Sequence, residues 1–142
     1  MSKWLFPLCL AFTFITCAPS SNVRLQDINP VRTYTAGYEQ VLDAIRMFAI
    51  KEGYKLDRFE TEYGTVIAHK TDTSGGAGRA GNDPMSQVIV MKLSVKRQTA
   101  QRTDLTAGFS FGGVHTTQTK GDEDLLVYNY TSLFEYLDGA LK

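Results

Sequence analysis

The sequence predicts an α+β fold, a two-layer sandwich in which two helices pack on one face of an antiparallel sheet of about four to five strands, in the order α-β-β-β-β-α. Two segments, 38–53 and 122–141, carry apolar residues at helical spacing. Between them lie segments whose apolar residues alternate with polar ones, as in half-buried strands. Most connections between these segments have hairpin length, which makes neighbouring strands antiparallel.

The N-terminal part of the predicted domain holds a short strand and the first helix. Residues 31–34 fit a short strand, and Thr35 is placed to cap the helix that follows. Gly53 fits the left-handed residue that ends a helix. The apolar stripe of this helix consists of Tyr38, Val41, Leu42, Ile45, Phe48 and Ala49.

A hairpin follows the first helix. Its strands are expected at 54–61 and 65–71, and Gly64 supplies the positive φ that the turn between them requires. The next segment, 71–84, is polar and contains four glycines. A stretch of this length without an apolar anchor predicts a mobile loop.

The second half of the domain contains the strongest strand signal. Residues 87–98 alternate strictly, the turn falls at 99–101, and a second amphipathic strand covers 103–111. This strand ends or bends at Gly112-Gly113, and residues 114–119 either continue it or pair back on it. The closing helix buries Leu126, Tyr130, Leu133, Phe134, Leu137 and Leu141.

Composition excludes several classes of protein. The chain has 142 residues, which suits one domain of the usual ~100–200 residues. It carries 15 basic and 15 acidic side chains, so no net positive field attracts nucleic acid, and none is expected as a partner. Two cysteines cannot build a disulfide framework or a four-thiolate zinc site.

The N-terminus has the features of a secretory signal. A short start with Lys3 precedes residues 4–15, which are twelve residues without a charge. A membrane-spanning helix needs roughly 20 apolar residues, whereas the apolar region of a signal peptide needs about 7–15. We therefore expect residues 1–16 to be a signal peptide.

The sequence Phe14-Ile15-Thr16-Cys17 resembles the lipobox of bacterial lipoproteins, in which the cysteine is acylated and becomes the first residue. Phe14 and Thr16 depart from the usual Leu and small residue, so the match is a relaxed one. The resemblance implies lipidation of Cys17 by palmitate-type chains, and Ala18 after the cysteine favours the outer membrane. Ordinary cleavage beside Pro19 and an incidental thiol at Cys17 are the alternatives.

Cleavage before Cys17 would divide the chain into three parts. Sixteen residues are removed and 126 of the 142 remain, with no thiol left free. Residues 17–30 hold the lipidated cysteine and a flexible tether rich in Pro, Ser and Asn, and 31–142 form a single α+β domain. The expected location is the outer membrane, with the domain facing the periplasm or the cell surface.

Two motifs match catalytic or cofactor signatures in sequence, but their expected secondary structure differs from that of the signatures. Residues 76–81 read G-x-G-x-x-G, but a strand and not a helix is expected after them, so a flexible loop is the better interpretation. Residues 108–112 read G-x-S-x-G, but Ser110 falls inside an alternating strand instead of a strand-to-helix turn. A hydrolase would need Ser110 beside His115 and an acid.

Other polar groups carry weaker signals. His69 and His115 could hold a metal with Asp104 or Asp72, but their spacing matches no known metal-site pattern. We therefore expect no metal and no cofactor. The carboxylates Asp57, Glu60 and Glu62 suit a solvated hairpin edge. The basic group of Lys92, Lys96, Arg97 and Arg102 suits a charged edge that blocks strand pairing.

Phe109 and Phe111 alternate on one face of a predicted strand. They could line a groove between sheet and helix, but core packing is the default interpretation. A groove would make the chain a carrier of a small apolar ligand or lipid.

Three features carry a family resemblance: Gly53-Tyr54 after the first helix, Gly64-Thr65-Val66-Ile67 in the hairpin, and the closing helix at 124–137. From Tyr38 to Leu141 the order of elements resembles small bacterial lipoproteins, and it is similar to the helix-grip-like domains of lipoprotein component C of the β-barrel assembly machine. The resemblance implies an envelope protein and transfers no catalytic residue. We expect a non-enzymatic lipoprotein that binds or scaffolds another envelope protein, with the carrier as the alternative.

Overall fold

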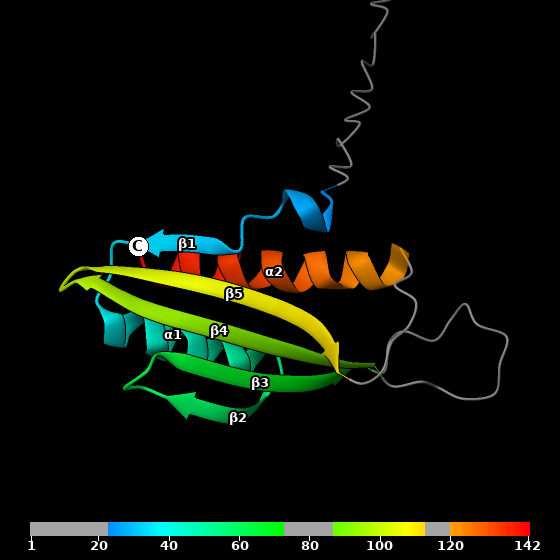
Figure 1. Ribbon diagram of the computed structural model, residues 1–142, viewed down its shortest axis with the longest axis horizontal. Helices are drawn as coiled ribbons and strands as arrows, with labels where there is room; N and C mark the ends of the chain where they lie inside the picture. The colour runs from blue at the N-terminus through cyan, green and yellow to red at the C-terminus, as the bar shows by residue number, and fades with distance from the viewer. Residues whose placement is uncertain (1–22, 73–86, 113–119) are drawn as a thin grey trace, which may run out of the picture.

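The computed structural model of the chain describes residues 23–72, 87–112 and 120–142. Its elements are the short 3₁₀ helix η1 (Leu25–Asp27), β1 (Val31–Tyr34), α1 (Tyr38–Lys51), β2 (Lys55–Glu60), β3 (Thr65–Asp72), β4 (Gln87–Thr99), β5 (Arg102–Gly112) and α2 (Lys120–Ala140). The five strands form one antiparallel sheet in the order β1-β5-β4-β3-β2, with both helices on one face (Figure 1). The predicted α+β sandwich is confirmed, with β1 as the fifth strand.

The core lies between the sheet and the two helices. α1 packs against β4 and α2 packs against β5. The alternation that predicted the strands places one set of side chains against the helices, which is why these residues are buried. The largest fully buried apolar side chains are Phe48, Leu42, Ile45, Ile89, Met91, Leu105, Leu133, Leu137, Val41 and Val66. Burial of each large one contributes about 1.5–3 kcal/mol relative to exposure.

Two polar side chains are buried in this core, and both have hydrogen-bond partners. Asn129 accepts a 2.7 Å hydrogen bond from the Tyr54 hydroxyl and donates one of 2.7 Å to the carbonyl of Leu125. Thr103 donates to the carbonyl of Ala36 at 2.9 Å. These bonds fix α2 against the start of β2, and β5 against the approach to α1.

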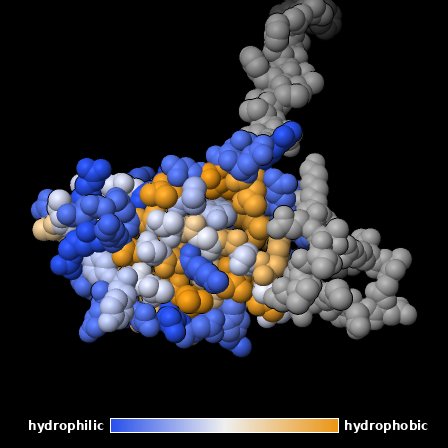
Figure 2. Space-filling model, viewed as in Figure 1, coloured by the Kyte–Doolittle hydropathy of each residue, from blue (hydrophilic) through white to orange (hydrophobic). Residues whose placement is uncertain are grey.

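The opposite face of the sheet is not covered by any helix of the described residues. Figure 2 looks onto this face and shows apolar and polar side chains mixed over the strands. Lys92, Ser94 and Lys96 of β4 are exposed on it, since they alternate with the buried residues of the same strand. Half-buried Val90 lies in the same row of side chains.

Both ends of α1 have local explanations. The helix begins at Tyr38, and the N–H of Gly37 donates to the Gln40 side chain at 2.9 Å. The expected cap at Thr35 was wrong by two residues, because Gln40 reaches back and takes over the capping role. Gly53 has φ +75° and confirms the left-handed end that the sequence predicted.

The ordered part of the domain begins before Val31. Residues 23–30 were expected to belong to the tether, but η1 packs on α2, and the N–H of Leu25 donates to Glu123 at 3.0 Å. Leu25 and Ile28 both pack against the core. Their spacing of three residues puts them on one side of a single turn, a pattern too short to stand out in the sequence.

Several expectations lie outside the described residues. They concern the signal peptide, Cys17, the glycine-rich loop with its G-x-G-x-x-G motif, His115 and the continuation at 114–119. In the part of the chain that the structure describes, no helix is long and apolar enough to cross a membrane.

Candidate functional site

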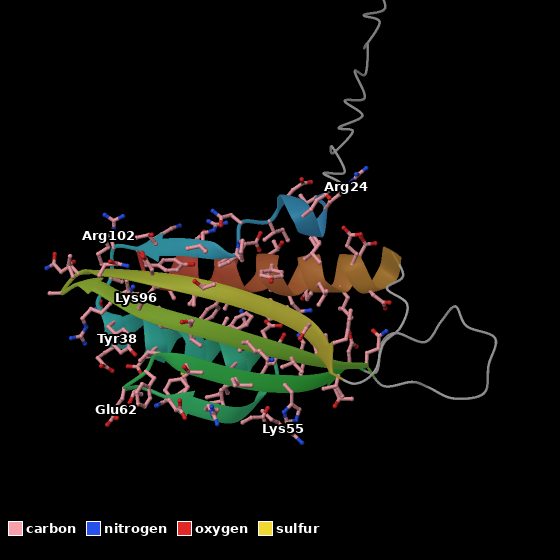
Figure 3. The ribbon with its side chains drawn as sticks, viewed as in Figure 1. Arg24, Tyr38, Lys55, Glu62, Lys96 and Arg102 are labelled. Carbon is pink, nitrogen blue, oxygen red and sulfur yellow. The ribbon has the colours of Figure 1, made fainter. Side chains whose placement is uncertain are left out.

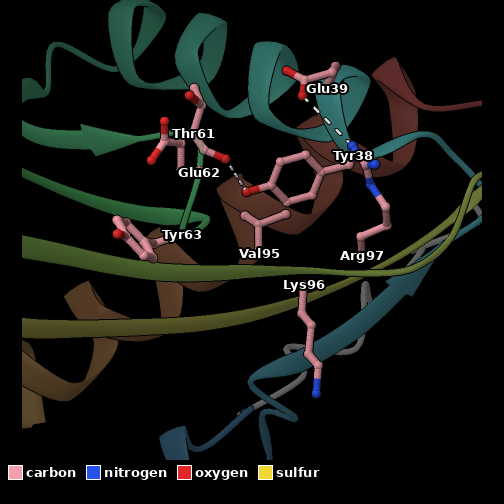
Figure 4. Close-up of a pocket in the computed structure, with 8 residues that line it drawn as sticks. All are labelled: Tyr38, Glu39, Thr61, Glu62, Tyr63, Val95, Lys96 and Arg97. Atoms are coloured by element: carbon pink, nitrogen blue, oxygen red, sulfur yellow. Dashed lines mark hydrogen bonds and ion pairs between the residues drawn. The ribbon is translucent and has the colours of Figure 1, made fainter.

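A pocket of about 500 Å³ opens where the β2–β3 turn, the start of α1 and β4 meet (Figure 4). It combines aromatic, acidic and basic side chains with one apolar residue. Its lining consists of Tyr38, Glu39, Thr61, Glu62, Tyr63, Val95, Lys96 and Arg97.

The backbone of the β2–β3 turn is fixed from two sides. The Tyr38 hydroxyl donates a 2.6 Å hydrogen bond to the carbonyl of Thr61, and the N–H of Val95 donates to the carbonyl of Gly64 at 2.7 Å. Gly64 has φ +65°, and a Cβ there would lie 1.9 Å from the Val95 carbonyl oxygen. Only glycine allows so close an approach, so the turn forms a rigid wall of the pocket.

One wall of the pocket carries a cation on an aromatic ring. The guanidinium of Arg97 lies 5.1 Å from the ring centroid of Tyr38. Its nitrogen Nη2 is 3.9 Å from Glu39 Oε1, which is too long for a hydrogen bond. Both side chains are well exposed, so this ion pair contributes little to stability, and Glu39 leaves the guanidinium donors available.

Tyr38 serves as a hydrogen-bond donor in the pocket. Partial burial and the neighbouring Glu39 raise the pKa of its phenol, and Arg97 opposes this shift. The hydroxyl donates its hydrogen bond to the carbonyl of Thr61. The ring and the turn behave as one preformed surface.

The pocket presents aromatic, donor and acceptor groups at the surface. Tyr63 is 75% exposed at the tip of the turn and offers an aromatic ring to a ligand. Glu39 and Glu62 supply acceptors and Arg97 supplies donors, an arrangement that suits a polar ligand such as a peptide segment. The Lys96 side chain points to the other side of the sheet (Figure 4).

The two phenylalanines that could have lined a groove pack into or against the core, as the default interpretation held. Phe109 is 8% exposed and meets Tyr130 edge to face, with 4.8 Å between ring centroids. Phe111 is partly buried against the same core. The carrier role stays a prediction.

The G-x-S-x-G motif lies within β5, where Ser110 is exposed and pairs with Val90. His69 pairs with the same Val90 from the other side, so β4 separates the serine from this imidazole. Two strand spacings of about 4.8 Å keep them near 10 Å apart, beyond hydrogen-bond reach. His69 is instead 2.7 Å from Asp57.

The other sequence candidates are dispersed. Asp104 bonds to Thr33 and Gln98 and lies six residues along β5 from Ser110, far from His69. The described residues contain no group of three or more metal-type ligands. The acidic trio separates as well: Asp57 meets His69, Glu60 meets Arg58 at 3.4 Å, and Glu62 lines the pocket.

The expected basic group is split by the pleat of β4. Lys92 and Lys96 lie on the open face, whereas Arg97 points to the helix side and lies over Tyr38. Sequence reasoning thus assigned Arg97 to a solvated edge and missed the pocket. The turn glycine Gly64 was the one available signal.

No family model matches the chain, and no curated protein matches it. Among the solved structures that are similar is an uncharacterized protein from Bacillus thuringiensis, at 12% sequence identity and a TM-score of 0.41. The match covers 78% of this chain and 95% of that one. At this level of similarity it carries no argument about function.

Proposed function

We propose that this chain is a lipid-anchored lipoprotein of the outer membrane whose domain binds another protein of the cell envelope and does not act as an enzyme. The anchor rests on Cys17 in its lipobox-like setting. The observation that supports binding is the pocket, which combines a fixed turn, the exposed ring of Tyr63 and the guanidinium of Arg97. Tyr38, Tyr63 and Arg97 belong to residue types enriched in protein interfaces, where tyrosine and arginine carry much of the binding energy.

The positions of tether and pocket suit this function. Cys17 and Arg24 are seven residues apart, and a chain of that length spans at most roughly 25 Å. A lipid on Cys17 would therefore hold the η1 end of the domain close to the membrane. Arg24 and the pocket residues Tyr38 and Glu62 lie at opposite ends of the domain (Figure 3). The pocket would face away from the anchor, toward a partner.

Photo-crosslinking in intact cells tests this proposal. A photoreactive residue replaces Tyr63 in the pocket, and the matched control replaces Tyr128, which is 57% exposed on α2. We expect one envelope protein to be captured from position 63 and not from 128, and its yield to fall when Arg97→Ala is added. Equal capture from both positions, or no capture, contradicts the proposal.

The anchor needs its own test. Cys17→Ala is expected to move the chain from the membrane fraction to the soluble fraction, because each buried acyl CH₂ contributes about 0.8 kcal/mol to membrane binding. Membrane association that survives the substitution contradicts anchoring through Cys17.

A further inference from the structure

One edge of the sheet is only partly covered by a strand. β4 pairs with β5 from Thr99↔Arg102 to Val88↔Gly112, along its whole length. β1 pairs with β5 only from Thr103 to Thr106. Beyond that point no described strand lies beside β5, and α2 runs along it instead (Figure 1).

Pro30 explains where the pairing stops. The N–H of Ala107 donates to the carbonyl of Pro30 at 2.8 Å, as in a hydrogen-bonded antiparallel pair. Such a pair normally returns an N–H to the opposite carbonyl, but proline has none, so the carbonyl of Ala107 receives no backbone bond from Pro30. The side chain of Asn29 accepts a hydrogen bond from the N–H of Val31 at 2.9 Å, at the start of β1.

A side chain takes the place of the missing strand. The hydroxyl of Tyr130 accepts the N–H of Phe109 at 3.2 Å and approaches the carbonyl of Ala107 at 3.5 Å. Both distances are long for such bonds. Two backbone groups of the edge are thus held by a single hydroxyl, at distances longer than those of a strand ladder.

We propose that the β5 edge from Ala107 to Ser110 is a docking edge for one extended segment of a partner protein. The segment would lie antiparallel to β5, in line with β1, and exchange backbone hydrogen bonds with Phe109 and Ala107 in place of Tyr130. This is strand addition, in which the main chain supplies affinity and alternate side chains supply specificity. The inference rests on the proposed function, because it describes how the bound envelope protein is held.

The surroundings favour a single strand over a second copy of the domain. η1 packs on α2 beyond this edge, with Leu25 and Ile28 against the core. A second sheet pairing here would bring its own η1 and α2 into that space. Figure 2 shows apolar surface beneath η1 alongside β5, so the inward side chains of the segment should be apolar and the outward ones polar.

The test places a photoreactive residue at Ser110, with Ser94 as the matched control. Both serines are exposed on the open face, but Ser94 lies one strand further in, on β4. We expect the protein captured from position 63 to be captured also from 110 and not from 94. The crosslinked peptide should be an extended segment of alternating apolar and polar residues. Tyr130→Phe should raise the yield several-fold, because it removes the competing hydroxyl.

A second measurement examines the edge directly. A synthetic copy of the crosslinked segment should slow hydrogen exchange at the Phe109 amide of the full lipidated chain at least tenfold. The same peptide N-methylated at alternate amides should not.

Other outcomes overturn the inference. Capture from 63 without capture from 110 leaves the proposed function standing and removes the docking edge. Crosslinks from 110 to a second copy, or to a segment of the same chain, assign the edge to those occupants instead. Capture from neither position contradicts the proposed function and the inference together.

Discussion

The hydroxyl of Tyr38 donates a 2.6 Å hydrogen bond to the carbonyl of Thr61, which ties the first residue of α1 to the turn between β2 and β3. The two residues are 23 positions apart in the chain. The bond joins the helical layer to the sheet at the rim of the pocket, next to the contact between Gly64 and Val95, since a Cβ on Gly64 would lie 2.9 Å from the Tyr38 hydroxyl. The shape of the pocket therefore depends on these two contacts.

Tyr38→Phe should lower the free energy of unfolding by about 1 kcal/mol, because it removes one hydrogen bond and leaves the Thr61 carbonyl without its partner. Urea unfolding measures the change. Tyr63→Phe is the control, since its hydroxyl is on an exposed side chain and its loss should change stability by less than about 0.5 kcal/mol. Equal effects of the two substitutions would contradict the role given to Tyr38.

Alanine substitutions at the two glycines with positive φ, Gly53 and Gly64, distinguish the effect of backbone strain from that of steric overlap. Gly53→Ala should destabilise the protein by roughly 1–2 kcal/mol, which is the strain of an alanine in the left-handed conformation. No atom lies within 4 Å of the added Cβ, so steric overlap adds nothing to this strain. Gly64→Ala adds the overlap with the Val95 carbonyl and should lose at least about 1 kcal/mol more. Thermal unfolding of both variants gives the comparison, and similar losses would refute the close approach at Gly64.

Sequence reasoning succeeded where a pattern repeats within one element. The stripe of α1 and the alternation of β4 and β5 were readable because each residue's neighbours along the chain determine its face. The start of α1 was misplaced because the reciprocal cap comes from Gln40, three residues inside the helix. The packing of η1 was missed because it depends on Glu123, 98 positions away.

The buried pair of Tyr54 and Asn129 should be energetically coupled. Tyr54→Phe leaves Asn129 Oδ1 without its donor in a buried setting and should cost roughly 1–3 kcal/mol. Asn129→Leu removes the same bond. A double-mutant cycle measured by urea unfolding should therefore give a coupling of about 1 kcal/mol or more. Additive losses would show that the bond contributes nothing of its own.

Stability should fall at alkaline pH because of buried tyrosines. Burial, followed by the charge of Asp138, raises the pKa of Tyr34 from 10.0 to about 12. The unfolded chain then loses this proton near pH 10 while the folded one keeps it. The contribution of Tyr34 is thus complete below pH 10 and declines as the pH rises from 10 to 12.

Tyr34→Phe isolates this effect. The variant should show a shallower fall in the free energy of unfolding between pH 10 and 12, by up to about 1.4 kcal/mol per pH unit. Tyr128→Phe, at an exposed position, should follow the unmodified protein. Parallel curves for Tyr34→Phe and the parent would exclude a raised pKa at Tyr34.

The pocket could not be predicted from the sequence for a different reason. It joins Tyr38 and Glu39 of α1, the turn at Glu62 and Tyr63, and Arg97 of β4, and only the sheet register brings these segments together. Arg97 looked like part of a basic edge because the pleat that turns it away from Lys96 has no signature in composition. The docking edge depends likewise on Pro30 lying opposite Ala107.

The proposed function depends on lipid anchoring at Cys17, which mass spectrometry of the mature N-terminus detects. Protein purified from membranes should yield an N-terminal peptide that begins at Cys17 and carries the added mass of two or three acyl chains. A peptide that begins at Met1, or one with an unmodified Cys17, would contradict the anchor.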